Sequence, residues 1–186
     1  MFFIYRLLTN LIFIFSPIII LIRLLKKKEH PTRFKEKFGI YTKKKLEGKL
    51  IWFHGASVGE ILSIIPLIEK LEKKNNIKQI LVTSNTLSSS TILSNLKLKK
   101  TIHQFFPIDT VYHTNKFLRY WKPSMAIFID SEIWPNMINN IKKQSATLIL
   151  INARITNKSF KRWKIFNLSA KHIFQKFDIC FSSNLK

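Results

Sequence analysis

The sequence is poor in cysteine and glycine, and each shortage excludes a class of site. The single cysteine, Cys180, cannot form an internal disulfide, and the scattered histidines give no spacing typical of a structural zinc site. Only four glycines occur in 186 residues, and neither G-x-G-x-x-G nor a Walker A motif is present. The sequence therefore argues against a structural zinc, a nicotinamide cofactor and a P-loop.

Acidic residues are also scarce. Ten Asp and Glu stand against 32 Lys and Arg, which gives a formal net charge of +22 and a pI near 10.3. Such a charge favours an anionic partner: nucleic acid, anionic lipid or a phosphorylated substrate. Compositional bias is the alternative, because lysine supplies most of the charge. The low arginine content argues against sequence-specific nucleic-acid recognition, so no nucleic-acid partner is expected.

Residues 1–25 are strongly apolar. The uncharged run from Leu7 to Ile22 is slightly shorter than the roughly 17–25 residues that span a bilayer, and Pro17 predicts a bend. Lys26, Lys27 and Lys28 follow at once, which favours a cytoplasmic position for the rest of the chain. We interpret residues 1–25 as an uncleaved anchor that either spans the membrane or lies in its interface. A cleaved signal peptide and a buried core helix are the alternatives.

Residues 26–49 form a basic segment broken by Pro31, Gly39 and Gly48. Its lysines suit the surface of an anionic leaflet, where each cation contributes on the order of 1 kcal/mol. We therefore predict a basic connector, with a solvated linker as the alternative.

From Leu50 onward, short apolar runs alternate with helix-period segments. The expected strands are 50–54, 79–83, 103–106, 125–129, 147–151 and 179–182. The expected helices are 58–74, one that follows the capping turn 84–86 and runs to about 96, 107–121, 134–143 and one amphipathic helix over 159–176. This alternation predicts an α/β domain over residues 50–186, a Rossmann-like parallel sheet with flanking helices.

The stretch Leu50–Glu60 reads as a strand, a small-residue turn and a helix N-terminus. Ser57-x-x-Glu60 fits a capping box, in which the glutamate reaches back to the amide of the cap residue. Glu60 is also a candidate general base, because ligands of open α/β sheets bind beyond the carboxyl ends of the strands. A helix N-terminus weakens a base, so that role needs burial or a second carboxylate nearby.

Polar residues follow each of the other expected strands, and we expect them to meet at one edge of the sheet. Asp130 and Glu132 share a face if the backbone stays extended, and a carboxylate there could raise the proton affinity of Glu60. Helix caps, or a buried ion pair with Arg154, are the alternative. The candidate site residues are Glu60 and Asp130 as catalytic groups, with Ser57, Gly59, Thr83, Thr86, Asp109, Glu132, Asn152 and Arg154 in binding or supporting roles.

Several of these motifs together resemble a known family. Ser57-Val58-Gly59-Glu60 after an apolar strand, Pro107-x-Asp109, Pro123, Glu132-Ile133-Trp134-Pro135-Asn136 and Asn152-Ala153-Arg154 with Ser159 are similar to the amino-terminal half of 3-deoxy-D-manno-octulosonic acid (Kdo) transferases. The similarity covers essentially the whole chain, including the apolar segment. It implies the amino-terminal half of a GT-B glycosyltransferase, the type built from two Rossmann-like domains.

The resemblance also implies an activity. The family transfers Kdo from CMP-Kdo to a lipid A precursor, lipid IVA, in lipopolysaccharide biosynthesis, with inversion and without a metal or other cofactor. Glu60 matches the family's base. Asp130 stands where the family has a glutamate thought to stabilise the transition state. The shorter side chain reduces its reach, unless Glu132 compensates.

The resemblance further implies a location and a missing half. The expected partners are the lipid A precursor, CMP-Kdo and the anionic surface of the inner (cytoplasmic) membrane, with the domain facing the cytoplasm. In the family the donor binds mainly to a second domain, so we expect this chain to be the acceptor-side half, with little activity alone. The rival hypothesis is a non-catalytic basic module that binds anionic membrane or nucleic acid.

Overall fold

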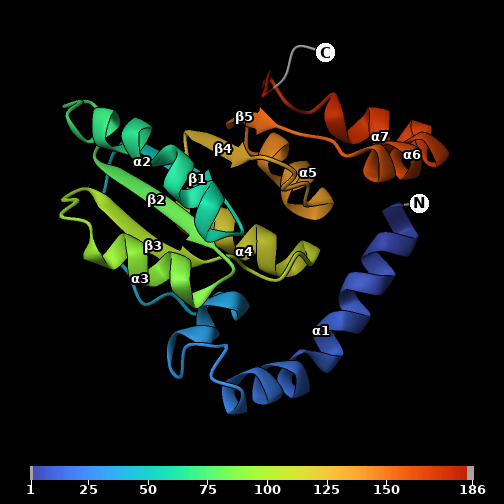
Figure 1. The fold of residues 1–186 in the computed structure, drawn as a ribbon, viewed down its shortest axis with the longest axis horizontal. Coiled ribbons are helices and arrows are strands. Elements are labelled where there is room, and N and C mark those ends of the chain that lie inside the picture. The colour runs from blue at the N-terminus through green and yellow to red at the C-terminus, as the bar shows by residue number, and fades with distance from the viewer. Residues whose placement is uncertain (1, 184–186) are drawn as a thin grey trace.

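A computed structural model describes residues 2–183. Six parallel strands form one sheet in the order β3-β2-β1-β4-β5-β6, as a Rossmann-like fold requires (Figure 1). The strands are β1 (Leu50–His54), β2 (Gln79–Ser84), β3 (Thr101–Phe105), β4 (Met125–Ile129), β5 (Thr147–Ala153) and β6 (Ile179–Ser182). The predicted fold class is confirmed, and each strand lies within two residues of its expected bounds.

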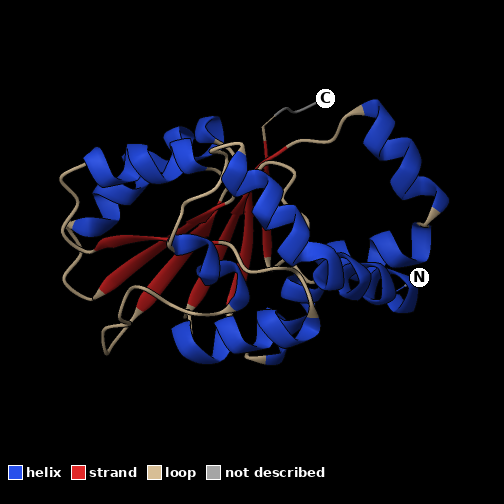
Figure 2. Cartoon of the chain, turned by 90° about the horizontal axis from the view of Figure 1, so that it is seen from below, coloured by secondary structure: helices blue, strands red, loops and turns tan. Residues whose placement is uncertain are grey.

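Helices cover both faces of the sheet (Figure 2). The alternation of side chains along each strand explains this arrangement. In β1, Trp52 packs into a core with α4 (Val111–Trp121) and α5 (Pro135–Lys143). Its neighbour Phe53 packs into a second core with α2 (Val58–Glu72) and α3 (Leu87–Asn95). Both side chains are fully buried, which is why the inner strands read as continuous apolar runs.

The prediction of one amphipathic helix over residues 159–176 is wrong in one respect. The structure has two helices there, α6 (Asn157–Ile165) and α7 (Asn167–Phe174). Phe166 joins them with φ −107° and ψ 42°, outside the helical region, so the helix cannot run straight through. The break turns α7 back, and Ile173 reaches the core beside α5.

The apolar helix α1 (Phe2–Leu25) is long and apolar enough to cross a membrane. One face contacts the domain: Tyr5 Oη donates to Asp109, and Phe13 lies 4.8 Å from His113 between ring centroids. Thr9 and Ile20 are buried on that face. Most of its large apolar side chains remain exposed, and the helix lies beside the αβ layers in Figure 1. The buried-core-helix alternative therefore does not hold.

Part of the basic segment 26–49 packs on the domain. Its 3₁₀ helix η1 (Arg33–Phe38) contacts β3. Glu36 is fully buried, pairs with Arg33 Nε at 2.8 Å and accepts from the Phe105 amide at 2.8 Å. Arg33 also donates to the His103 carbonyl at 2.9 Å. These bonds hold the segment to the edge of the sheet, so the solvated-linker alternative does not apply to residues 33–38.

Candidate active site

The strand order reverses direction between β1 and β4, and a cavity of about 280 Å³ lies at their carboxyl ends. Ligands of open α/β sheets bind at such a switch point. Six of the ten candidate site residues line this cavity, beside Ser63 and Ile129: Ser57, Gly59, Glu60, Asp130, Asn152 and Arg154. The structure therefore brings together residues from the ends of β1, β4 and β5.

Glu60 is held by the turn that precedes α2. Its Oε2 accepts from the Ala56 amide at 2.8 Å, and its Oε1 accepts from Ser57 Oγ at 2.7 Å. Ser57 Oγ in turn accepts from the Glu60 amide at 3.4 Å. The capping box is therefore present, but the carboxylate reaches the amide before the cap residue rather than that of Ser57. These bonds fix the carboxylate at the cavity wall.

Two glycines shape this wall. A Cβ at Gly55 would lie 3.0 Å from Cβ of Glu60 and 3.1 Å from Cδ1 of Ile129, closer than side chains normally pack. A larger residue at Gly55 would therefore displace the glutamate. A Cβ at Gly59 would meet nothing within 4 Å, so this position opens onto free space. The Glu60 side chain is thus packed against Gly55 on one side and lines the cavity on the other.

Asp130 directly follows β4, and Asn152 is the penultimate residue of the adjacent strand β5; both have left-handed backbones, at φ 60° and 52°. Asp and Asn adopt this region more readily than most residues, yet it remains uncommon. The turn at Asp130 places its carboxylate toward the cavity, 4.0 Å from Arg154 Nε. Asn152 Nδ2 lies 3.5 Å from Ser63 Oγ on α2. Unusual backbone of this kind concentrates at functional sites.

The backbone at Asp130 is left-handed and not extended, so the condition under which Asp130 and Glu132 would share a face is not met. Glu132 lies 3.2 Å from His54 Nε2 and accepts from Trp134 Nε1 at 2.8 Å. Burial opposes ionisation of Glu132, but the hydrogen bonds from His54 and Trp134 and the charge of His54 outweigh it and lower the pKa of the carboxyl. Glu132 therefore supports the loop below the cavity and does not line it.

His54 is a buried support of the site that the sequence did not reveal. It is fully buried at the end of β1, with its ring stacked 3.8 Å from Phe106 and its Nδ1 3.0 Å from Thr83 Oγ1. Through Nε2 it connects β1 to Glu132. Its position immediately before the turn at Gly55 was the available signal.

Three other candidates lie away from the cavity lining. Thr83 points into the sheet interior, where Oγ1 accepts from Trp52 Nε1 at 2.8 Å. Thr86 caps α3. Asp109 is buried and accepts from the backbone amides of Asn136 and Met137 at the start of α5, at 3.1 and 2.8 Å. Thr86 and Asp109 therefore follow the helix-cap alternative, and Thr83 has structural partners inside the fold.

Within residues 2–183, no group of three or more His, Cys, Asp or Glu side chains is arranged to hold a metal ion. The chemistry that these residues offer at the cavity is that of carboxylates, hydroxyls, one amide and one guanidinium. Such a set can accept a proton from a hydroxyl group and orient a polar ligand.

Comparison with known proteins gives consistent matches. Residues 32–185 match the family described as 3-deoxy-D-manno-octulosonic-acid transferase (kdotransferase). A 3-deoxy-D-manno-octulosonic acid transferase of Rickettsia bellii is 45% identical over 86% of this chain and 38% of the relative. A probable mitochondrial 3-deoxy-D-manno-octulosonic acid transferase of Arabidopsis thaliana is 38% identical over 87% of this chain and 37% of the relative. The chain thus spans less than two fifths of the length of these relatives.

Among solved structures, a UDP-N-acetylglucosamine 2-epimerase superposes with a TM-score of 0.52 over 73% of this chain and 42% of that structure. At 12% identity this likeness concerns the fold alone.

Proposed function

This chain belongs to the 3-deoxy-D-manno-octulosonic-acid transferase family, and we propose that it supplies the acceptor-side domain of an enzyme that transfers Kdo from CMP-Kdo to lipid IVA. One observation carries the proposal. The carboxylates of Glu60 and Asp130 and the guanidinium of Arg154 line one cavity at the switch point of the sheet. A sugar hydroxyl that enters this cavity meets a fixed carboxylate as its proton acceptor.

Glu60 acts in this proposal as the general base. Each of its oxygens accepts one hydrogen bond from the protein, which leaves further lone pairs for the acceptor hydroxyl. The hydroxyl oxygen attacks the anomeric carbon of Kdo while its proton passes to Glu60, and CMP departs from the opposite face, which inverts the configuration. A positioned base of this kind contributes typically ~10²–10⁴ in rate.

Asp130 and Arg154 have supporting parts. The two side chains lie 4.0 Å apart, a loose pairing that leaves the guanidinium free to bind an anionic group of the substrate. Arg154 is 66% exposed, so a ligand can reach it without breaking a buried contact. We propose that Asp130 stabilises the positive charge that develops on the donor sugar. No cofactor or metal is assigned a role in this scheme.

Membrane association completes the proposal. The exposed apolar side chains of α1 and the lysines at 26–28 suit a leaflet that is apolar inside and anionic at its surface. We propose that the domain lies on the cytoplasmic side of the inner membrane, where a lipid acceptor is presented to the cavity. In this scheme a second domain binds most of CMP-Kdo, as in the family.

The test is a transfer assay with CMP-Kdo and tetra-acylated lipid IVA. We would assay this chain alone and a chimera in which it replaces the matching 162 residues of the Rickettsia bellii relative. Transfer by the chimera, well above that of the chain alone, supports an acceptor-side domain. A folded chimera that binds lipid but transfers no Kdo contradicts the proposal.

The net charge of +22 favours a second candidate, a non-catalytic module that binds polyanions. This candidate predicts binding to any polyanion, with an affinity that falls steeply with salt. It also predicts that Glu60→Gln leaves the function of the protein, binding of polyanions, unchanged. Binding of lipid IVA that persists at 0.5 M NaCl, with loss of turnover in Glu60→Gln, excludes it.

A further inference from the structure

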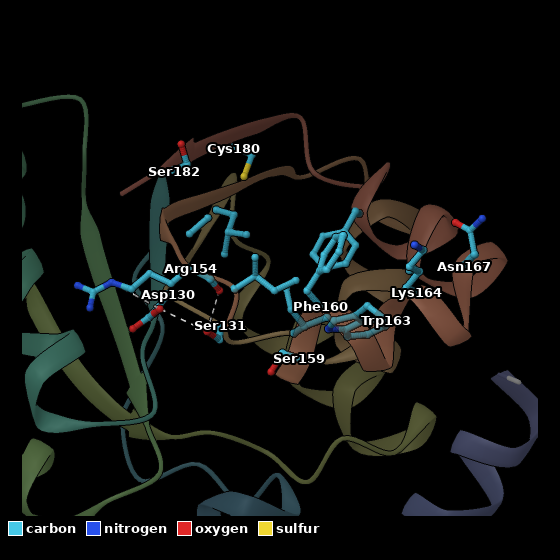
Figure 3. A pocket seen from close by; sticks show the side chains of 16 residues that line it. Asp130, Ser131, Arg154, Ser159, Phe160, Trp163, Lys164, Asn167, Cys180 and Ser182 are labelled. Atoms are coloured by element: carbon cyan, nitrogen blue, oxygen red, sulfur yellow. Dashed lines mark hydrogen bonds and ion pairs between the residues drawn. The ribbon is translucent and has the colours of Figure 1, made fainter. Parts of the chain in front are cut away.

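A larger pocket lies directly beside the active-site cavity. It has a volume of about 760 Å³ and lies between the ends of β4 and β5, the edge strand β6 and the helices α6 and α7. Figure 3 shows Asp130 and Arg154 at one end and Lys164 and Asn167 at the other. Asp130 and Arg154 also line the active-site cavity. The two hollows are therefore contiguous at these residues.

The lining of this pocket differs from that of the cavity. Ile133 and Leu150 contribute from the sheet side, and Trp163 and Phe174 contribute from the helices, with ring centroids 5.3 Å apart. Phe160 lines the pocket as well, although it is 55% exposed. The pocket is within the size range of small-molecule sites, which are mostly apolar with a few polar groups.

Charge is distributed unevenly around this pocket. Lys164 lines it, and Lys161 and Arg162 are exposed on the same helix, which carries no acidic residue. Arg154 stands at the border with the active-site cavity. A ligand that fits has an apolar part for the pocket and an anionic part for its rim. An amphiphile meets both conditions, whereas a soluble sugar phosphate leaves the apolar wall uncovered.

We propose that this pocket binds a fatty acyl chain of the acceptor whose sugar hydroxyl reaches Glu60. The inference rests on the proposed function and specifies how that site recognises its substrate. Contact with the apolar wall would extract one chain from the bilayer and align the sugar with the cavity. Each methylene that leaves water should tighten binding about fourfold, so affinity depends on chain length.

The single cysteine of the chain provides the assay, because Cys180 lines the pocket and is exposed. A ligand in the pocket shields the thiol, whereas an alkyl chain bound to α1 does not. The probes are monoalkyl phosphates with four to ten carbons, kept below their micelle concentrations. The readout is the rate at which N-ethylmaleimide modifies Cys180 as a function of probe concentration. Protection should appear at about fourfold lower concentration for each added methylene.

Two variants and a control locate the binding. Ala170→Trp fills the pocket, since Ala170 lines it from α7. Phe160→Asp places a charge on the apolar wall at a half-exposed position, so folding is retained even if the tryptophan variant fails to fold. Leu168→Trp adds the same indole to α7 at a position that is 85% exposed and does not line the pocket.

The inference requires protection of Cys180 that depends on chain length in the wild type and in Leu168→Trp. In Ala170→Trp and Phe160→Asp, the probe concentration needed for protection should rise at least tenfold. Protection that is independent of chain length, or that survives in both pocket variants, overturns it and leaves the apolar wall to another occupant, such as a polypeptide segment. Because these measurements involve no donor, they stand apart from the proposed function. If protection depends on chain length but the chimera transfers no Kdo, only the transferase proposal is contradicted. If the chimera transfers Kdo but protection does not depend on chain length, only the acyl-chain site is contradicted.

Discussion

The buried carboxyl of Asp109 should make the stability of the protein decrease as the pH rises from about 4 to 6. Asp109 is 4% exposed, and it accepts hydrogen bonds from Tyr5 Oη and from the amides of Asn136 and Met137. Burial disfavours its charged form more strongly than these bonds favour it, and raises the pKa from 3.8 to about 6. The folded state therefore binds this proton more tightly than the unfolded state does.

The sign and size of the effect follow from linkage. Below pH 3.8 the carboxyl is protonated in both states, so its contribution to stability is fully present and does not change with pH. Between pH 3.8 and 6 the unfolded chain loses the proton first, so the free energy of unfolding falls. A shift of about two pKa units corresponds to ~3 kcal/mol, lost in full above pH 6.

The assay is urea unfolding between pH 4 and 7, for the wild type and for Asp109→Asn, whose side chain does not titrate. Because other groups titrate in both proteins, the informative quantity is the difference in free energy of unfolding, wild type minus variant. We expect this difference to fall by ~3 kcal/mol across the range. Tyr5→Phe is the control: it removes one donor but leaves the carboxyl buried, so its pH dependence should persist.

A difference that stays constant with pH, or rises, would refute the reasoning. It would mean that the two amides at the start of α5 and the Tyr5 hydroxyl stabilise the carboxylate at least as much as burial penalises it.

Three further predictions concern other parts of the fold. Arg33→Met should cost about 3–5 kcal/mol in chemical unfolding, because it leaves the fully buried Glu36 without its cation; an unchanged midpoint would contradict this role. The stability that Glu132 contributes through its lowered pKa is present above its ordinary pKa and lost as the pH falls through the lowered value. The difference in melting temperature between wild type and Glu132→Gln should therefore shrink in acid, and a constant difference would argue against the pair with His54. Replacing both Leu7 and Ile14 on the exposed face of α1 by lysine should abolish co-sedimentation with neutral vesicles and leave the circular dichroism spectrum unchanged, and retained binding would rule out this face.

Much of the fold could be predicted from the sequence because local patterns and the fold agree. The apolar run at 125–129 gave the bounds of β4 to the residue, since the strand is flanked by Pro123 on one side and by Asp130 on the other. The break between α6 and α7 could not be predicted in this way. The polar and apolar residues of 159–176 keep a helical period across Phe166, and only the docking of Ile173 on the core requires a turn there.

The candidate site was predictable in position more than in detail. Strand-end reasoning gathered Glu60, Asp130, Asn152 and Arg154 correctly around one cavity. It could not tell which side chains turn into the protein. The orientation of each side chain depends on backbone conformation and on partners that are distant in the sequence. The left-handed turn at Asp130 directs Glu132 toward His54, and Asp109 accepts a hydrogen bond from the Met137 amide at the start of α5.

The most direct test of the central claim is the turnover of the Glu60→Gln variant in the chimera with the Rickettsia bellii relative, with CMP-Kdo and lipid IVA as substrates. Glutamine can still accept the Ala56 amide and complete the capping box, so stability and lipid binding should be retained. The account predicts that kcat falls by ~10²–10⁴ while the melting temperature changes little. Turnover within a few fold of the wild type, in a folded variant, would contradict the assignment of Glu60 as the base.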